Sequence, residues 1–200
     1  MEAATQPRPL AGERAQRIVE AMRHSVAQRG VAGSTFDHVA REAGVSRGLL
    51  HYYFGTKEQL LVEVVRRDCE VRLAVLDEQL GGATTAEDFI EVLVSQLEHV
   101  VRHQPETWEV VYELFSLSRR NDEIAVELAE LMRRTRDHLA ALLAAKQEEG
   151  VLHLHADPEA ITDILFGLGD GIALRMLAEP ERDFSATVRA GVVAVRALLV

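Results

Sequence analysis

The segment from residue 34 to residue 61, STFDHVAREAGVSRGLLHYYFGTKEQLL, constrains the fold of this chain more than any other part. It predicts a short first helix whose apolar residues recur at helical spacing, namely Phe36, Val39, Ala40 and Ala43. Ser34 is the expected N-cap of this helix, and Asp37 adds negative charge at its positive end. Gly44 and Val45 then fit a tight turn between two helices. The segment therefore predicts a helix-turn-helix.

The second helix of this motif is expected to start after Ser46, a good N-cap, and to end at Gly55. Its apolar residues Leu49, Leu50 and Phe54 are expected to hold it against the core. The opposite face then presents polar, aromatic and small residues to solvent or to a partner, namely Arg47, Gly48, His51 and Tyr52, with Tyr53 between the two faces.

A third helix is expected to begin directly after this motif. Thr56 and Gln59 have the spacing of a capping box. Lys57 lies in the first turn, where a positive charge opposes the helix dipole. A nearby phosphate would explain that lysine, and DNA is therefore the first partner to consider.

The whole pattern across residues 13 to 61 resembles the DNA-binding domain of the TetR family of transcriptional regulators. The resemblance includes an amphipathic helix from Glu13 to Arg29, the AGVS turn, the LLHYYF helix and the GTKEQLL restart. It implies that the second helix of the motif enters the major groove and that Arg47 reads a base, because an arginine can contact guanine through two hydrogen bonds. It implies phosphate contacts, which set register without reading sequence, for Thr35, Ser46, Tyr52 and Lys57.

Two positions depart from the family pattern. His51 stands where the family usually has tyrosine, and Tyr53 stands where it often has histidine. Either side chain can still donate to a phosphate, and Gly48 would let the helix approach the groove closely. The alternatives are that Arg47 is a solvated surface charge and that Tyr52 and Tyr53 are half-buried aromatics.

Charge is divided unevenly along the chain, whose formal net charge is −10. Residues 1 to 57 carry eight Lys or Arg against five Asp or Glu, which gives +3, whereas residues 58 to 200 carry fourteen against twenty-seven, which gives −13. A weakly basic head attracts phosphates, and an acidic body confines DNA binding to that head.

Composition narrows the class of protein further. The 200 residues include 48% hydrophobic residues and a single cysteine, Cys69, so the chain has enough apolar mass for a core and cannot form an intrachain disulfide. We see no signal peptide and no apolar run long enough for a membrane span, and we expect a cytoplasmic protein. Residues 1–12 are expected to be a flexible arm, whose Arg8 could reach a minor groove.

Beyond residue 61 the pattern stays helical, so we expect an all-α fold with three parts: an arm over 1–12, a three-helix DNA-binding head over 13–61, and a larger helical ligand-binding and dimerisation body over 62–200. Helices are expected from Thr56 to about Leu80, after Thr85 to Gln104, from Pro105 to about Arg119, from Asn121 to near Gly150, from Pro158 to about Ala178, and over 184–198.

An aromatic trio in the body, formed by Trp108, Tyr112 and Phe115, lies on one face of a short helix and includes the only tryptophan. These side chains could line a site for an apolar or cationic organic ligand. The alternative is an ordinary core stripe.

The FGLGDGIALRML segment from Phe166 to Leu177 places Gly167, Gly169 and Gly171 inside a helix, where each costs about 1 kcal/mol relative to alanine. Close packing of helices would offset that cost, and a local kink is the alternative. The segment resembles the penultimate helix of TetR-family bodies, which implies a four-helix dimer interface. Its expected apolar residues are Leu168, Ile172, Met176, Val188, Val192, Val195 and Leu199.

Catalysis is not expected, because the chain lacks an HExxH motif, a glycine-rich phosphate loop and a nucleophile elbow. The pairs His99/His103 and His153/His155 lack the further ligands of a metal site, and we expect no cofactor. The sequence thus favours a homodimeric repressor that leaves a palindromic operator in double-stranded DNA when a small-molecule effector binds. The alternative is a helical protein-interaction module that dimerises without specific DNA binding.

Overall fold

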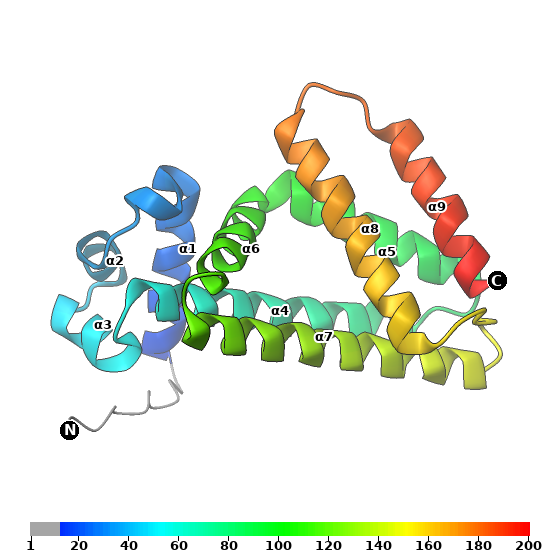
Figure 1. The fold of residues 1–200 in the computed structure, drawn as a ribbon, viewed down its shortest axis with the longest axis horizontal. Coiled ribbons are helices and arrows are strands. Elements are labelled where there is room, and N and C mark those ends of the chain that lie inside the picture. Colours follow the sequence, from blue (N-terminus) through cyan, green and yellow to red (C-terminus); the bar gives the residue numbers. More distant parts are fainter. Residues whose placement is uncertain (1–12) are drawn as a thin grey trace. The chain divides into compact units, whose positions relative to one another are not determined.

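The computed structural model describes residues 13–200, and this part of the chain is all-α, with nine helices and no strand (Figure 1). The helices are α1 (Glu13–Gly33), α2 (Phe36–Ala43), α3 (Arg47–Phe54), α4 (Lys57–Gly81), α5 (Ala86–His103), α6 (Pro105–Ser118), α7 (Asp122–Glu148), α8 (Pro158–Ala178) and α9 (Ser185–Leu199). The expected all-α class is confirmed. The arm and Arg8 lie outside the described residues.

The described chain divides into two compact units, and the dividing points lie inside helices. The first unit contains the residues through Asp68 together with Glu109–Ala129, and the second contains Cys69–Trp108 and Glu130–Val200. The boundary that we expected at residue 61 therefore falls within the first unit. Helices α4, α6 and α7 each contribute residues to both units. The helical sequence pattern has no break at the dividing points, so it does not predict them.

The first unit is built around the N-terminal helices. Helix α1 buries Ile18, Met22 and Val26, and it packs on α2, which in turn packs on α3. Helix α1 extends beyond its expected end at Arg29, with a kink at Gly30, where φ is 67° and ψ is 171°. Helices α3 and α4 add the buried residues Leu50, Phe54, Leu60 and Leu61 to this core.

The second unit has its own core, to which α4, α5, α7, α8 and α9 contribute. Its buried residues are Leu80, Ala83, Ala86, Phe89, Ile90, Leu139, Leu143, Leu152, Ile161 and Leu199. Within this unit α5 packs against both α8 and α9, and these two helices also contact each other. Helices α4 and α7 run side by side here (Figure 1), joined by His138 Nε2 and Asp77 Oδ1 at 2.7 Å.

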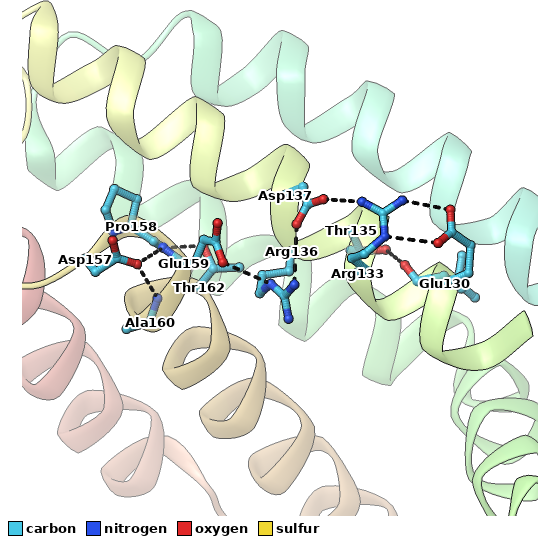
Figure 2. Close-up of polar contacts among 11 residues, drawn as sticks. Glu130, Arg133, Thr135, Arg136, Asp137, Asp157, Pro158, Glu159, Ala160 and Thr162 are labelled. Carbon is cyan, nitrogen blue, oxygen red and sulfur yellow. Dashed lines mark hydrogen bonds and ion pairs between the residues drawn. The ribbon is translucent and has the colours of Figure 1, made fainter. Parts of the chain in front are cut away.

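Local capping explains where α5 and α8 begin. Thr85 and Asp88 form the two reciprocal hydrogen bonds of a capping box, and hydrogen bonds from Thr85 and Thr84 lower the pKa of Asp88. At α8, the Asp157 carboxylate accepts hydrogen bonds from the backbone N–H groups of Glu159 and Ala160, and Pro158 occupies the first turn. Figure 2 shows this cap beside the ion pair between Arg136 of α7 and Glu159. Both starts agree with the sequence prediction.

A row of charged side chains follows the same face of α7 (Figure 2). Arg133 binds the Glu130 carboxylate through Nε and Nη2 and the Asp137 carboxylate through Nη1. Hydrogen bonds from Arg133 and Arg134 lower the pKa of Glu130 to about 2. Arg133 and Arg134 are exposed, and Glu130 and Asp137 are half-buried, so the row stabilises α7 modestly through i, i+3 and i, i+4 pairs at its surface.

Candidate nucleic-acid interface

The turn between α2 and α3 has the geometry that a helix-turn-helix requires. Gly44 adopts a left-handed conformation, with φ 66° and ψ 36°, and its N–H is directed at the carbonyls of Ala40 and Arg41. The N–H of Val45 donates to the Ala40 carbonyl at 2.9 Å, which closes the end of α2. A residue with a Cβ is strained at this φ, so the glycine of the AGVS turn is explained by its backbone.

The N-cap of α2 differs from the one expected. Thr35, rather than Ser34, caps the helix, because the Thr35 hydroxyl accepts a hydrogen bond from the backbone N–H of His38 at 3.4 Å. Ser34 is buried and its hydroxyl donates to the Gly30 carbonyl at 2.9 Å. The kinked turn after Gly30 extends α1 and brings that carbonyl within reach. Ser34 therefore caps the C-terminal end of α1. The sequence alone does not show which of two adjacent hydroxyl residues caps α2.

Helix α3 has one buried and one exposed face. Leu50 and Phe54 are buried and Leu49 is half-buried, as expected, while the opposite side carries exposed side chains and the exposed Gly48. Tyr52 is 62% exposed, which excludes the half-buried alternative for this residue, whereas Tyr53 is half-buried. The Tyr52 and Tyr53 rings meet edge to face, with centroids 5.1 Å apart. Six predicted DNA-binding residues therefore gather on or just before one short helix: Ser46, Arg47, Gly48, His51, Tyr52 and Tyr53.

Two hydroxyl groups at the helix starts are already used as caps. Thr35 caps α2, and Ser46 Oγ accepts from the backbone N–H of Leu49 at 3.2 Å at the start of α3. In both cases the hydroxyl oxygen accepts, so its own proton remains available for donation to another acceptor. A helix N-terminus also offers backbone N–H groups and a positive dipole to an anion. These positions are chemically suited to phosphate contacts.

Lys57 has a protein partner that the sequence did not reveal. Its Nζ donates a 3.0 Å hydrogen bond to the carbonyl of Val31, near the end of α1, and the side chain is half-buried. A nearby phosphate is therefore not needed to explain a lysine in the first turn of α4. An ammonium group has three protons, so Lys57 retains the capacity to bind a phosphate as well. The Thr56 hydroxyl accepts from the N–H of Gln59 at 3.2 Å, as the expected cap requires.

Arg47 is held by two neighbours. Its Nη1 lies 3.2 Å from Oδ2 and 3.4 Å from Oδ1 of Asp37, on α2. Its Nε donates to Nε2 of His51, one turn along α3, at 3.3 Å. The sequence alone indicates only a helix-dipole role for Asp37, because a contact across ten residues depends on the angle between α2 and α3. The structure adds Asp37 to this surface.

The aromatic trio lies on α6, and the division between the two units falls directly after Trp108. Trp108 is buried in the second unit, while Tyr112 and Phe115 belong to the first. Phe115 is 43% exposed, so it does not lie in a core stripe. Within the second unit, burial raises the pKa of Asp170 on α8, and the positive charge of Arg72 on α4 opposes this increase.

Of the seven residues expected at the dimer interface, one is fully buried and six are half-buried. Leu199 is 0% exposed and belongs to the core of the second unit, so its expected place at an interface is corrected. Val192 and Val195 pack against the same core, and Leu168, Ile172, Met176 and Val188 are half-buried. A Cβ added at Gly191 would lie 3.4 Å from Ile172 Cδ1, which shows how closely α8 and α9 pack.

The outer faces of α8 and α9 carry other apolar and small residues. On α8 the exposed positions Ile164, Gly167, Gly171, Leu174 and Ala178 follow one another at alternating steps of three and four residues. On α9 and at its C-cap Val200, the exposed positions Ala186, Ala190, Val193, Ala197 and Val200 do the same. A Cβ added at Gly167 or Gly171 would meet nothing within 4 Å among the described residues. We call these ten positions the α8–α9 outer face.

Across residues 13–200, no group of three or more potential ligands is arranged to hold a metal ion. His99 and His103 lie with ring centroids 4.9 Å apart, and His153 and His155 with centroids 4.8 Å apart. Among the same residues, no helix combines the length and hydropathy needed to span a bilayer.

The fold and the exposed α3 surface define a helix-turn-helix DNA-binding protein, and comparison with known proteins identifies its family. Residues 18–64 match the family model of bacterial regulatory proteins of the TetR family, and residues 90–197 match that of the C-terminal region of BetI-type transcriptional repressors. The chain belongs to the TetR family of transcriptional regulators.

Individual relatives cover most of the chain. It is 29% identical over 168 residues to the HTH-type transcriptional regulator BetI of Rhizobium meliloti, an alignment that spans 81% of this chain and 77% of that protein. Two solved structures share the fold. The transcriptional regulator FadR from Bacillus subtilis in complex with stearoyl-CoA has a TM-score of 0.71 at 18% identity and covers 90% of this chain and 98% of its own. A regulator from Saccharomonospora viridis in complex with choline has a TM-score of 0.70 at 22% identity, with 93% and 97% covered.

Proposed function

We propose that this regulator is a homodimeric repressor that binds a palindromic operator through α3 and leaves it when a small organic effector binds to the second unit. The observation that carries the DNA-binding part is the two-sided character of α3. Leu50 and Phe54 are buried, while Arg47, Gly48, His51 and Tyr52 are exposed on the other side. A helix that exposes polar side chains and packs through its other side on a three-helix core is suited to the major groove.

The residues around α3 divide into base-reading and phosphate-binding groups. Arg47 is the base reader, because its guanidinium can contact guanine O6 and N7 together. Phosphate contacts come from Thr35, Ser46, Tyr52, Tyr53 and Lys57, whose donors surround the helix. Gly48 lacks a side chain on the exposed face, which lets the backbone of α3 come close to the groove.

The α8–α9 outer face is the proposed dimer surface. Ile164, Leu174, Val193 and Val200 are large apolar residues left exposed on two neighbouring helices. A partner copy would bury them, and the alternation of three and four residues is that of helices packed in a four-helix bundle. Gly167 and Gly171 then permit close approach of a partner helix, which accounts for their cost inside α8.

A two-fold dimer should recognise two half-sites separated by about one helical turn or a multiple of it. Effector binding changes operator occupancy only through its different affinity for the DNA-binding and non-binding states. A coupling of about 1 to 3 kcal/mol corresponds to roughly a 5- to 150-fold change in operator affinity. Choline and stearoyl-CoA, each bound to one structural neighbour, are the first compounds to test.

Fluorescence anisotropy of the purified protein with tiled duplexes from around its own gene, at physiological salt, tests the DNA-binding proposal. We expect tight binding to one fragment that a shuffled duplex of the same composition fails to compete away. Steep weakening as salt rises is also expected, because phosphate contacts release counterions. Equal binding to every fragment would contradict sequence-specific regulation by this surface.

The effector part needs a separate readout. Trp108 is the only tryptophan and is buried in the second unit, so its emission reports changes in that unit without a label. An effector should change both this emission and the operator anisotropy over the same concentration range. A compound that changes the emission while operator affinity stays constant would bind without acting as an inducer.

A further inference from the structure

The contacts of Arg47 engage its guanidinium from two sides. Asp37 contacts Nη1 from α2, and His51 contacts Nε from α3. These three residues, named here the Arg47 cluster, all lie in the first unit. A long arginine side chain on an exposed helix surface has many rotamers, and ordering it costs conformational entropy. Contacts with two elements restrict it before any partner arrives.

The two contacts of His51 fix the tautomer of its ring. Nε2 lies 3.3 Å from Arg47 Nε, which can only donate, so Nε2 must accept. Nδ1 lies 3.2 Å from the carbonyl oxygen of Gly55, which can only accept, so Nδ1 must carry the proton. Both contacts are satisfied together only by the neutral ring protonated at Nδ1. The Phe36 ring packs against the imidazole at 4.8 Å, in an edge-to-face arrangement.

The Gly55 carbonyl is placed by an unusual backbone conformation. Gly55 has φ 69° and ψ −65° at the end of α3, and its own N–H donates to the carbonyl of His51 at 3.0 Å. His51 and Gly55 are therefore joined by a backbone and a side-chain hydrogen bond in opposite directions. A left-handed φ favours glycine here. The end of α3 thus orients the histidine, and the histidine in turn orients the arginine.

The contact of Asp37 with Arg47 can explain why a negative charge lies at the proposed DNA surface. A carboxylate beside a DNA-binding helix repels phosphates and lowers affinity for every DNA sequence. It also offsets part of the attraction supplied by Arg47. A residue with this general cost is explained if it improves discrimination among sequences, and orientation of the base-reading guanidinium does so. Affinity and discrimination should therefore respond to Asp37 in opposite directions.

We propose that Asp37 and His51 are positioning residues that set the base preference of Arg47. This inference rests on the proposed function, in which Arg47 reads a base in the major groove. Asp37 and His51 act through Arg47 and need not contact DNA for this role. The base that Arg47 selects therefore depends on the contact between α2 and α3 as well as on α3 itself.

The test uses the full-length protein and a pool of DNA duplexes with about 24 random base pairs, roughly two helical turns. Bound duplexes are sequenced to give the base preference at each position for the wild-type protein and its variants. Arg47→Ala should reduce the preference at one position of each half-site by about 5- to 150-fold, the range for one bidentate base contact. Asp37→Asn and His51→Asn should reduce it at the same position by up to about fivefold, the factor that corresponds to about 1 kcal/mol for an exposed pair.

Two matched variants separate positioning from other effects. His51→Gln places an amide oxygen near the position of Nε2 and should retain most of the preference, whereas His51→Asn is too short to reach Arg47 and loses the same ring packing. Glu42→Gln removes one negative charge from the same helix as Asp37 without contacting Arg47. It should raise affinity for all duplexes and leave the base preference unchanged, while Asp37→Asn raises general affinity and weakens the preference.

The outcomes distinguish this inference from the proposed function. If the wild-type protein shows no base preference, the proposed function fails. If Arg47→Ala alone reduces the preference and both Asp37→Asn and His51→Asn retain it in full, the function stands and the positioning roles are overturned. If His51→Gln loses as much preference as His51→Asn, the hydrogen bond to Arg47 is not the source of the effect, and the role of His51 is overturned.

Discussion

Lys146 of α7 donates a 2.8 Å hydrogen bond to the carbonyl oxygen of Gly81, the last residue of α4. The same ammonium group donates to the carbonyl of Ala83 at 3.2 Å and to the Glu149 carboxylate at 2.7 Å. Lys146 is buried, so it neutralises the negative end of α4 where water has little access. It joins α4 and α7 at the end of the second unit.

Replacing Lys146 with methionine should destabilise the second unit by about 2 to 4 kcal/mol, because two carbonyl groups lose their donor in a buried setting. Urea unfolding followed by circular dichroism measures the loss. Glu149→Gln removes only the exposed partner of the lysine and should cost no more than about 1 kcal/mol. Equal losses for the two variants would show that the ion pair, rather than the capping of α4, carries the stabilisation.

The raised pKa of Asp170 predicts that the stability of the folded protein decreases as the pH rises. Burial raises its pKa in the folded protein above the ordinary value of 3.8, while Arg72 opposes the shift. The contribution of this group to the free energy of unfolding is therefore fully present below pH 3.8 and is lost as the pH rises through the raised pKa. Asp170→Asn should remove that loss and gain stability relative to the wild type as the pH rises toward 7.

Chemical unfolding of both proteins between pH 3 and pH 7, on the order of one measurement per half unit, checks this prediction. Asp163→Asn, which changes an exposed aspartate on the same helix, is the control for the substitution itself. A constant difference between Asp170→Asn and the wild type over this range would show that burial of the carboxylate has no net effect on stability.

Two glycines in the helix-turn-helix should respond to alanine with opposite signs. Gly44 has φ 66°, so Gly44→Ala places a side chain in a left-handed conformation and should cost about 1 to 2 kcal/mol. Gly48 lies in the regular part of α3, and Gly48→Ala should stabilise the fold by up to about 1 kcal/mol. Thermal unfolding measures both changes.

The same pair separates folding from DNA binding. The added methyl group of Gly48→Ala faces the proposed DNA surface, so this variant should bind the operator more weakly although it is more stable. Gly44→Ala should bind more weakly in proportion to its loss of folded protein. An increase in operator affinity for Gly48→Ala would contradict the close approach of α3 to the groove.

Local signals explain why most helix ends were predictable from sequence. The Asp157-Pro158 start of α8, the Thr85 cap of α5 and the glycine at the end of α3 depend on neighbouring residues alone. Ser34 and Thr35 show the limit of such signals, because two adjacent hydroxyl residues compete for one cap. The choice followed from the kink at Gly30, which sequence periodicity did not reveal.

Relationships between helices were less predictable. The contact of Asp37 with Arg47 and that of Lys57 with Val31 depend on the packing of separate helices. Helix α8 posed a further problem, because apolar and glycine residues occupy all of its faces. Ile161 lies in the core, Ile172 packs beside α9, and Ile164 is exposed, so apolar periodicity alone could not separate an internal face from an external one.

The exposed valine at the centre of α9 offers the sharpest test of the revised dimer surface. Val193 is 70% exposed within the α8–α9 outer face, so Val193→Arg should fold normally as a monomer. Burial of an unpaired guanidinium from each copy should weaken the dimer by at least about 2 kcal/mol, roughly 30-fold in dissociation constant. Analytical ultracentrifugation over a concentration series measures that constant.

Val71→Arg is the matched control, because Val71 is a 64% exposed valine of α4 in the same unit, outside the α8–α9 outer face. It should leave the dimer intact. Val193→Arg should also lose operator affinity at concentrations where it is monomeric, since one head then binds one half-site alone. A dimer that survives Val193→Arg and dissociates with Val71→Arg would place the interface on α4 instead, and the exposed glycines of α8 would need another explanation.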